Sequence, residues 1–338
     1  MNQMNDVINL DENTISKCDS SRTSSVTKFL KKLIYNYNTI LMLIILIVMS
    51  TILHDRFMTA NNIMNILKQN AAAMIIAMGM LFVILTGGID LSVGSVAAFG
   101  SVGVATGIVA YGMSTGLSII TTLVLGMILG LFTGILVSFV KMAPFISSLA
   151  MMTIARGLAL IISNGGPIKT PDGTLDVIGK WTIGVLPGIM IIAIVVITIF
   201  FTVHKFTGFG RIVIAIGSNS SAVRLAGIKV EHYLLSVYAL SGLCAALAGI
   251  ISASRTYLGS PTTGVSMELD AIAAVVIGGG SLAGGKGYVV RTIAGVIILG
   301  LISNVMNLVG VPPYPQDVIK GFIIIGAVVL QGVTNNHG

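Results

Sequence analysis

Residues 83–95 read VILTGGIDLSVGS: an apolar run stops at two glycines, an aspartate follows, and an apolar run resumes. Residues 275–285 read VVIGGGSLAGG and have the same plan. Glycine lets the backbone leave a helix, and a broken helix inside an apolar segment exposes backbone polar groups. Paired glycine-interrupted segments are typical of membrane proteins with a duplicated core. We therefore predict two glycine-interrupted internal repeats.

The composition around these segments is that of a membrane protein. Of 338 residues, 55% are hydrophobic and 9% are charged, and the mean hydropathy is +0.98. A soluble domain carries about 25% charged residues. This length would correspond to about two soluble domains, and the chain has too few charged residues for their surfaces. An ordinary cytosolic enzyme, a secreted disulfide scaffold and a disordered adaptor are excluded. The fold class predicted is an all-α polytopic membrane protein.

Apolar runs set the expected domain organisation, because a helix needs about 20 apolar residues to cross a bilayer. We expect a polar, disordered cytoplasmic tail at residues 1–38, a transmembrane domain at residues 39–332 and a short C-terminal tail at residues 333–338. About ten transmembrane helices are predicted, of which the eighth is short enough to cross the membrane only in part. They are expected at residues 39–53, 62–85, 91–110, 117–140, 144–163, 183–203, 233–253, 269–280, 288–309 and 317–332.

The distribution of Lys and Arg predicts the orientation. With the N-terminus inside, eleven of these residues flank the inner face and six flank the outer face. Positive charge concentrates on the cytoplasmic side of membrane proteins, so both termini are predicted to lie inside. The same rule explains the net charge of +7 without nucleic-acid binding.

Asp90 is the most informative charged residue. On insertion scales an aspartate at the bilayer centre costs about 2.5–3.5 kcal/mol, so such a residue has a function or a partner. It either caps a helix that starts at Leu91 or otherwise supports the fold, contacts the solute directly, or lies at a water-exposed interface. Arg156 and Arg291 either extend toward the membrane surface or pair with an acid such as Asp90. Asp270, which precedes an apolar run, is expected in the first turn of a helix.

Sequence motifs of catalysis are weak. Residues 280–286 match G-x-x-x-x-G-K, but residue 287 is Gly where a phosphate-binding loop needs Ser or Thr to hold magnesium. The histidines lie at span edges or in the tail without the spacing of a metal site. We expect no enzyme activity, no catalytic or metal-binding residues, and no bound cofactor in this chain.

The largest predicted cytoplasmic loop, residues 204–231, contains a short helix signal. Asn219 or Ser220 is a suitable N-cap and Gly227 a suitable C-terminal stop. A short amphipathic helix in a water-facing loop either fits a groove of a partner or packs on its own membrane domain. Its apolar side would comprise Ala222, Val223, Leu225 and Ala226.

Small residues elsewhere predict close packing. Gly126, Gly130 and Gly134 form a stripe for contact with a helix of this chain or of a second copy. Cys244, inside an apolar run, is expected to be a small buried hydrophobic residue, and Cys18 lies in the polar tail.

Three motifs in order carry a resemblance: GGIDLSVGS at residues 87–95, the loop at residues 217–230, and ELDAIAAVVIGG followed by SLAGGKG between residues 268 and 287. They are similar to the ribose-type permeases of bacterial ABC sugar importers, and the similarity extends over residues 40–332. It implies a multi-pass protein of the bacterial cell membrane that imports a monosaccharide, with ribose as the first expectation. The expected partners are ATPase subunits that bind ATP and Mg, an extracytoplasmic sugar-binding protein and a second permease copy, with no nucleic acid.

The resemblance also assigns candidate residues. One departure is Ser220, where relatives often carry an acidic residue, and this puts a salt bridge to the ATPase from that position in doubt. The expected coupling helix to the ATPase comprises Asn219, Ser220, Ser221, Ala222, Val223, Arg224, Leu225, Ala226 and Gly227. The residues expected to line the translocation pathway or to be critical for the fold are Gly87, Gly88, Asp90, Ser92, Asp270, Gly278 and Gly279.

Two other hypotheses remain open. A secondary transporter would couple uptake to a proton through Asp90 and need no ATPase. An intramembrane enzyme would need a nucleophile and a base in facing spans, and the sequence offers only Asp90.

Overall fold

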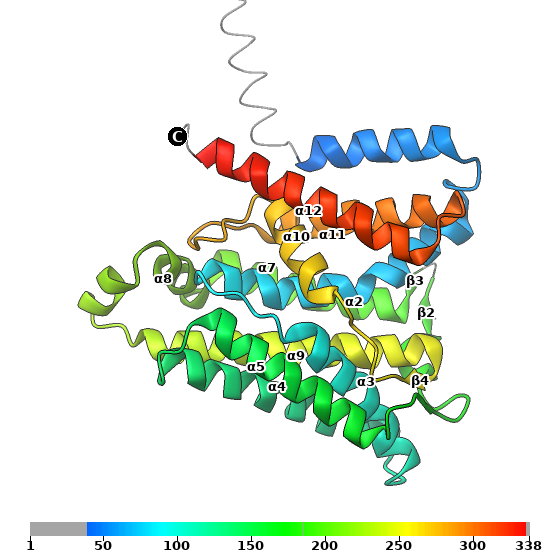
Figure 1. The fold of residues 1–338 in the computed structure, drawn as a ribbon. Helices are drawn as coiled ribbons and strands as arrows, with labels where there is room; N and C mark the ends of the chain where they lie inside the picture. The colour runs from blue at the N-terminus through cyan, green and yellow to red at the C-terminus, as the bar shows by residue number, and fades with distance from the viewer. Residues whose placement is uncertain (1–38, 185, 336–338) are drawn as a thin grey trace, which may run out of the picture.

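A computed structural model of the protein describes residues 39–184 and 186–335 (Figure 1). The predicted tail at residues 1–38, Cys18 and the last three residues of the predicted C-terminal tail lie outside the described residues. Two short antiparallel strand pairs join β1 (Ile168–Lys169) to β4 (Leu258–Gly259) and β2 (Thr182–Ile183) to β3 (Leu186–Pro187). The helices are Thr39–Leu53, α2 (Ala60–Leu85), α3 (Val93–Val109), α4 (Thr115–Ser138), α5 (Pro144–Ile162), α6 (Asp176–Gly179), α7 (Gly188–Phe206), α8 (Gly208–Leu225), α9 (Val230–Thr256), α10 (Met267–Ile277), α11 (Val289–Leu308) and α12 (Pro313–Asn335).

Every apolar run predicted to span the membrane contains a helix. Six helices (α2, α4, α5, α7, α9 and α11) are long and apolar enough to cross a membrane, and Thr39–Leu53 and α3 are shorter apolar helices. Helix α7 begins at Gly188, not at residue 183, because the preceding residues form the β2–β3 hairpin. Helix α12 continues to Asn335, into the tail predicted at residues 333–338. The all-helical membrane class is confirmed.

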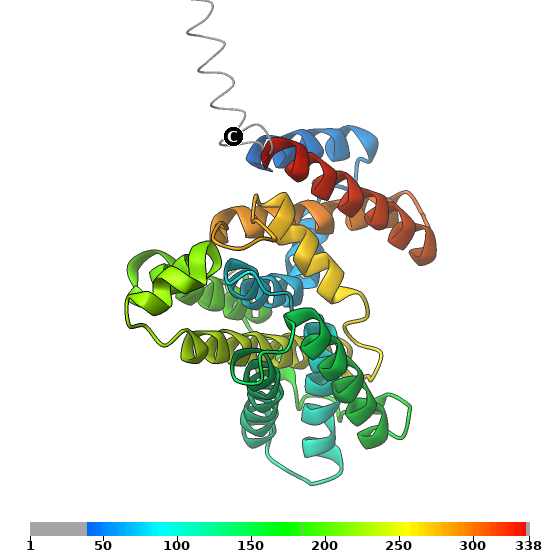
Figure 2. The ribbon, with the colours of Figure 1, turned by 60° about the vertical axis from the view of Figure 1, so that its left-hand side comes forward.

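Helices α2 and α9 form the centre of the bundle (Figures 1 and 2). Their apolar windows are 78% and 67% buried, whereas those of α4, α5 and α7 are 28%, 28% and 22% buried. Because the peripheral helices α4, α5 and α7 keep large apolar side chains exposed, their outer faces are suited to lipid. Cys244 on α9 is 4% exposed, in agreement with the predicted structural role.

The glycine stripe of α4 packs against α9 of the same chain. A Cβ on Gly130 would lie 2.3 Å from the carbonyl oxygen of Tyr238, and one on Gly126 would lie 2.3 Å from Ala246 Cβ. Any larger side chain would push the two helices apart, so the stripe sets their spacing. Intrachain packing, one of the two alternatives for this stripe, is therefore the one observed.

Helices α3 and α10 both begin inside the bundle, not at its surface. The segment that enters α10 touches the first turn of α3, since a Cβ on Gly264 would lie 2.4 Å from the carbonyl oxygen of Gly94. In Figure 1 the segment after β4 runs from the β-strand end of the bundle into its middle before α10 begins. This depth explains why α10 has only 11 residues.

Candidate functional site

Helices α2 and α10 end in the same way at the two glycine-interrupted segments. At the end of α2 the N–H of Gly87 donates to the carbonyl of Ile84, and the next N–H reaches back to Val83, at 2.9 and 3.2 Å. At the end of α10, Gly279 and its successor repeat this pattern with two bonds of 2.8 Å. Both glycines have φ +81°, a left-handed conformation that terminates helices and favours glycine.

The two interrupted segments and α8 meet through their backbones. The N–H of Gly285 donates to the carbonyl of Leu85 at 3.0 Å. A Cβ on Gly217 of α8 would lie 1.9 Å from that same carbonyl oxygen and 2.5 Å from the nitrogen of Gly285. A Cβ on Gly284 would lie 2.8 Å from the nitrogen of Gly87. The motifs that stood apart in the sequence therefore converge at one contact that admits no side chain.

Asp90 holds the first interrupted segment inside the bundle. Its Oδ1 accepts the backbone N–H of Ser92 at 3.0 Å and the Ser92 hydroxyl at 2.6 Å, and its Oδ2 accepts the Ser241 hydroxyl of α9 at 2.7 Å. Helix α3 begins at Val93, not at Leu91, and no side chain caps it, so Asp90 supports the fold without capping the helix. The carboxylate instead closes the turn before the helix and ties it to α9.

The two intramembrane arginines do not pair with Asp90. Arg156 Nη1 donates to the carbonyls of Pro261 and Thr263 at 2.5 and 2.9 Å, so it holds the segment that enters α10. Arg291 lies over the Tyr288 ring at 4.5 Å, in a cation–π contact at the start of α11. Sequence reasoning had no means to find these partners, which are backbone carbonyls and a neighbouring ring.

Helix α8 bends sharply at Asn219, whose φ of −161° and ψ of 93° are not helical. Its side-chain oxygen accepts the N–H of Ala222 at 3.0 Å, which caps the short helix that comes next. Gly227 ends that helix with φ +79°. The predicted cap and stop are thus confirmed by the local geometry.

The short helix after Asn219 has one buried apolar side chain and one large apolar side chain that is almost fully exposed. Val223 is 7% exposed and packs with Ile216 and Val230, whereas Leu225 is 90% exposed. The expected apolar side does not form one buried face, because Ala222 and Ala226 are exposed as well. The helix therefore rests on its own domain through Val223 and presents Leu225 outward.

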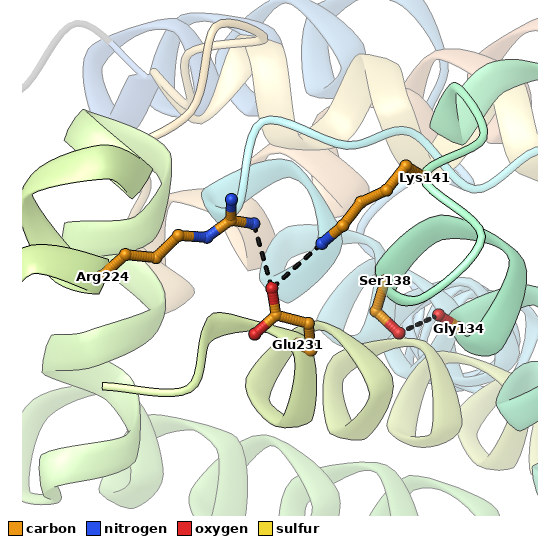
Figure 3. Close-up of polar contacts among 5 residues, drawn as sticks. All are labelled: Gly134, Ser138, Lys141, Arg224 and Glu231. Atoms are coloured by element: carbon orange, nitrogen blue, oxygen red, sulfur yellow. Dashed lines mark hydrogen bonds and ion pairs between the residues drawn. The ribbon is translucent and has the colours of Figure 1, made fainter. Parts of the chain in front are cut away.

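An ion cluster fixes the short helix to the bundle (Figure 3). Glu231 Oε1 pairs with Lys141 Nζ at 3.0 Å and with Arg224 Nη2 at 3.2 Å. The Ser138 hydroxyl donates to the Gly134 carbonyl at 2.6 Å, just before the turn that carries Lys141. One carboxylate thus links α9, the α4–α5 turn and the short helix.

Sequence reasoning missed Glu231 and Lys141. The available signal was charge: Glu231 is the only acidic residue in the basic loop at residues 204–231. Its partner Lys141 is distant in sequence, so the pair could not be assigned without the fold.

Asp270 lies away from this convergence. Its Oδ2 is 3.5 Å from Lys320 Nζ of α12, beside a separate pocket of about 170 Å³ that Gln69 and Asn70 also line. Gly278 packs its Cα against the backbone of Arg291, where a Cβ would lie 2.8 Å away. Of the predicted pathway residues, Gly87 and Gly88 lie beside α8, and Asp90 is bonded to Ser92 and to α9. Gly278 and Gly279 lie next to Arg291 of α11, and Asp270 lies next to Lys320 of α12.

A second polar cluster lies at the β-strand end of the bundle. The Tyr257 hydroxyl donates to the Asp176 carboxylate, and Lys180 Nζ pairs with the same side chain at 3.1 Å. The Tyr257 hydroxyl and, less strongly, Lys180 hold the pKa of Asp176 below its ordinary value. The cluster fastens α6 to the end of α9.

The described residues contain no group of three His, Cys, Asp or Glu side chains that could hold a metal ion. The G-x-x-x-x-G-K stretch joins two helices, α10 and α11, whereas a phosphate-binding loop comes after a strand.

A bundle with six helices long and apolar enough to cross a membrane, and with interrupted segments between helices, is that of a multi-pass membrane protein. The chain belongs to the family described as the branched-chain amino acid transport system / permease component, whose model matches residues 62–328.

Curated relatives are similar over almost their whole length. The ribose import permease protein RbsC of Bacillus subtilis is 47% identical, over 86% of this chain and 90% of the relative. The protein of the same name from Escherichia coli K12 is 40% identical, over 90% and 95%. The L-arabinose transport system permease protein AraH of Escherichia coli K12 is 36% identical, over 87% and 90%. No solved structure matches the chain significantly.

These relatives confirm the resemblance to ribose-type permeases. The chain is a multi-pass permease subunit of an ABC importer in the cell membrane, and it is not an enzyme.

Proposed function

We propose that this chain forms the membrane pathway of an importer for a monosaccharide, with ribose as the first candidate, and that separate ATPase subunits bind ATP and Mg. The names of the relatives support ribose. The observation that supports a pathway driven by ATPase subunits is the close contact of α8 with both interrupted segments, where Gly217 lies against Leu85 and Gly285.

The helix at residues 219–227 is the proposed coupling helix. Leu225 is 90% exposed at its surface, which suits an apolar groove on an ATPase. Behind it, Arg224 and Lys141 share the Glu231 carboxylate, so a displacement of the helix is passed to α9 and to the α4–α5 turn. Coupling of this kind needs contacts that differ between two states, and the backbone contact at Gly217 is the element that would differ.

The assembly we propose has ten spans per chain with both termini inside, and two glycine-interrupted repeats. The basic residues around α8, which include Lys205, Arg211 and Lys229, support placing that end in the cytoplasm. A second permease copy completes the pathway, and a sugar-binding protein docks at the β-strand end.

Reconstitution of the permease with its ATPase and binding protein in proteoliposomes tests this function. We expect ribose uptake that requires ATP and co-purification of the ATPase. Uptake driven by a pH gradient without any ATPase would instead support a proton-coupled transporter.

Gly227→Pro tests the coupling helix in the same assay. Proline holds φ near about −65°, which is incompatible with a left-handed stop, so we expect uptake to be abolished while membrane insertion persists. Gly227→Asn is the matched control, because asparagine tolerates this conformation and should retain uptake. Normal uptake by Gly227→Pro would refute the coupling role.

A further inference from the structure

We propose that the pocket between α8 and the bundle binds a neutral monosaccharide on the cytoplasmic side, with the Tyr238 hydroxyl as a hydrogen-bonding group at its inner wall. This inference rests on the proposed function and adds a solute site to it. The proposed sugar site lies beside the contact between α8 and the interrupted segments and is distinct from it.

The pocket has the size and walls of a small-molecule site. Its volume is about 500 Å³, within the range of about 300–1,000 Å³ found for ligand pockets. The first interrupted segment, α8, α9 and the α4–α5 region all contribute to it. The lining residues that carry side-chain hydroxyl, amide or guanidinium groups are Thr86, Ser218, Asn219, Ser220, Arg224 and Tyr238.

Tyr238 is the feature that points to a ligand. The side chain is 0% exposed, yet its hydroxyl has no hydrogen-bond partner in the described part of the chain. Buried tyrosine hydroxyls usually find a hydrogen-bond partner, and a buried hydroxyl without one is destabilising. A Cβ on Gly88 would lie 2.6 Å from this hydroxyl, so only glycine lets the first interrupted segment pass so close to it.

Two serine hydroxyls, one on the same helix as Tyr238 and one in the pocket lining, already bond to other groups. Ser241 on the same helix donates to Asp90, and Ser218 donates to the Ile214 carbonyl at 3.1 Å. Tyr238 therefore keeps both a donor and an acceptor available for a ligand from the pocket.

The charge of the lining favours a neutral polyol. Among the described residues that line the pocket none is acidic, and its one cation, Arg224, is paired with Glu231. An ionic ligand would meet no free countercharge there, whereas sugar hydroxyls can both donate to and accept from the polar side chains.

Because α8 and the first interrupted segment form its walls, occupancy of this pocket is linked to the position of α8. Binding free energies are reciprocal, so a sugar that favours one position of α8 must oppose the other. Sugar accumulated on the inside should therefore slow further import.

The test measures the initial rate of ATP-driven uptake of labelled ribose into proteoliposomes that contain the full complex and increasing internal unlabelled ribose. We expect internal ribose to inhibit the wild type. Tyr238→Phe should need about 3- to 10-fold more internal ribose for half-inhibition, the size of one lost hydrogen bond. Removal of an unpartnered buried hydroxyl should leave the protein as stable as the wild type.

Two further variants make the outcome decisive. Tyr233→Phe is the matched control, because Tyr233 is on the same helix, lies 5.6 Å from the Phe209 ring and does not line the pocket. Thr86→Val removes a second lining hydroxyl at nearly constant volume and should also weaken inhibition. Wild-type inhibition in both Tyr238→Phe and Thr86→Val overturns the site while leaving the import function intact. Absence of ATP-driven uptake by the wild type refutes the proposed function itself.

Discussion

In the two interrupted segments, the links that follow α2 and α10, residues 86–92 and residues 278–288, begin alike and continue differently. Both leave a helix through a glycine with φ +81° and the same pair of backbone bonds. The first then re-enters the bundle under the control of Asp90, which is 1% exposed. The second contains no acidic residue and is closed by backbone bonds, such as Ser281 N–H to the Lys286 carbonyl at 2.9 Å.

The difference shows that glycine decides where a helix stops, whereas other groups determine the path of the chain beyond the stop. A left-handed glycine also ends α8 at Gly227 and α11 at Gly310, with φ +79° and +78°. The shared cap is therefore a general helix stop in this chain, and internal duplication remains a prediction. We infer that the first segment is the fixed one, bonded to α9 by side chains, and that the second rests on it through backbone contacts such as Gly285 N–H to the Leu85 carbonyl.

Asp90→Ala should have the largest effect. It leaves the Ser92 and Ser241 donors buried without an acceptor, at about 1–3 kcal/mol for each group. We expect a lowered midpoint of thermal unfolding of the purified permease and impaired uptake. Asp90→Asn retains an oxygen acceptor, so its unfolding midpoint and its uptake should fall less than those of Asp90→Ala.

Ser281→Ala is the matched change in the second segment. Because the Ser281 bond to the Lys286 carbonyl comes from the backbone, this variant should remain close to wild type. If Asp90→Ala were unaffected in both assays, Asp90 would be dispensable and the contrast between the two segments would disappear.

Gly217→Ala should have the next largest effect, since it wedges α8 away from both segments. The new Cβ would meet the Leu85 carbonyl oxygen at 1.9 Å, and backbone atoms cannot rotate aside. We expect ATP-driven uptake to be lost while membrane insertion and ATPase co-purification persist.

Gly208→Ala is the control for that wedge. Gly208 begins the same helix, and within the described ranges no atom lies within 4 Å of its Cβ position. Uptake should be unchanged. If both substitutions lowered uptake equally, the effect would come from alanine anywhere in α8 and not from the contact of Gly217 with the two interrupted segments.

Sequence reasoning located the helices well because apolar runs and glycine stops are local signals. It misjudged the start of α7, where apolar residues such as Ile183 and Leu186 enter a hairpin, and apolarity alone does not separate a strand from a helix. It did not find the Glu231 cluster or the carbonyl partners of Arg156. These depend on which segments meet in space, and one chain's sequence does not encode that in any local pattern.

The smallest effect we predict separates the two glycine stops themselves. Alanine at φ +81° costs about 1–2 kcal/mol at either position, because the left-handed conformation brings Cβ toward the next carbonyl. Gly279→Ala meets only the flexible end of Arg291, at 3.8 Å, so it should show this conformational cost alone. Gly87→Ala also meets the Ala283 carbonyl oxygen at 3.3 Å and should be the more destabilising of the two.

Paired thermal unfolding of the two variants measures this difference. A free-energy change of 1 kcal/mol lowers the midpoint by about 2–4 °C in a domain of about 150–250 residues, so the comparison needs both proteins in the same detergent. A lower unfolding midpoint for Gly87→Ala than for Gly279→Ala would place the tighter packing at the first segment. A lower midpoint for Gly279→Ala would show that the second segment is the more constrained one. The second segment would then be the fixed one, and the first would rest on it.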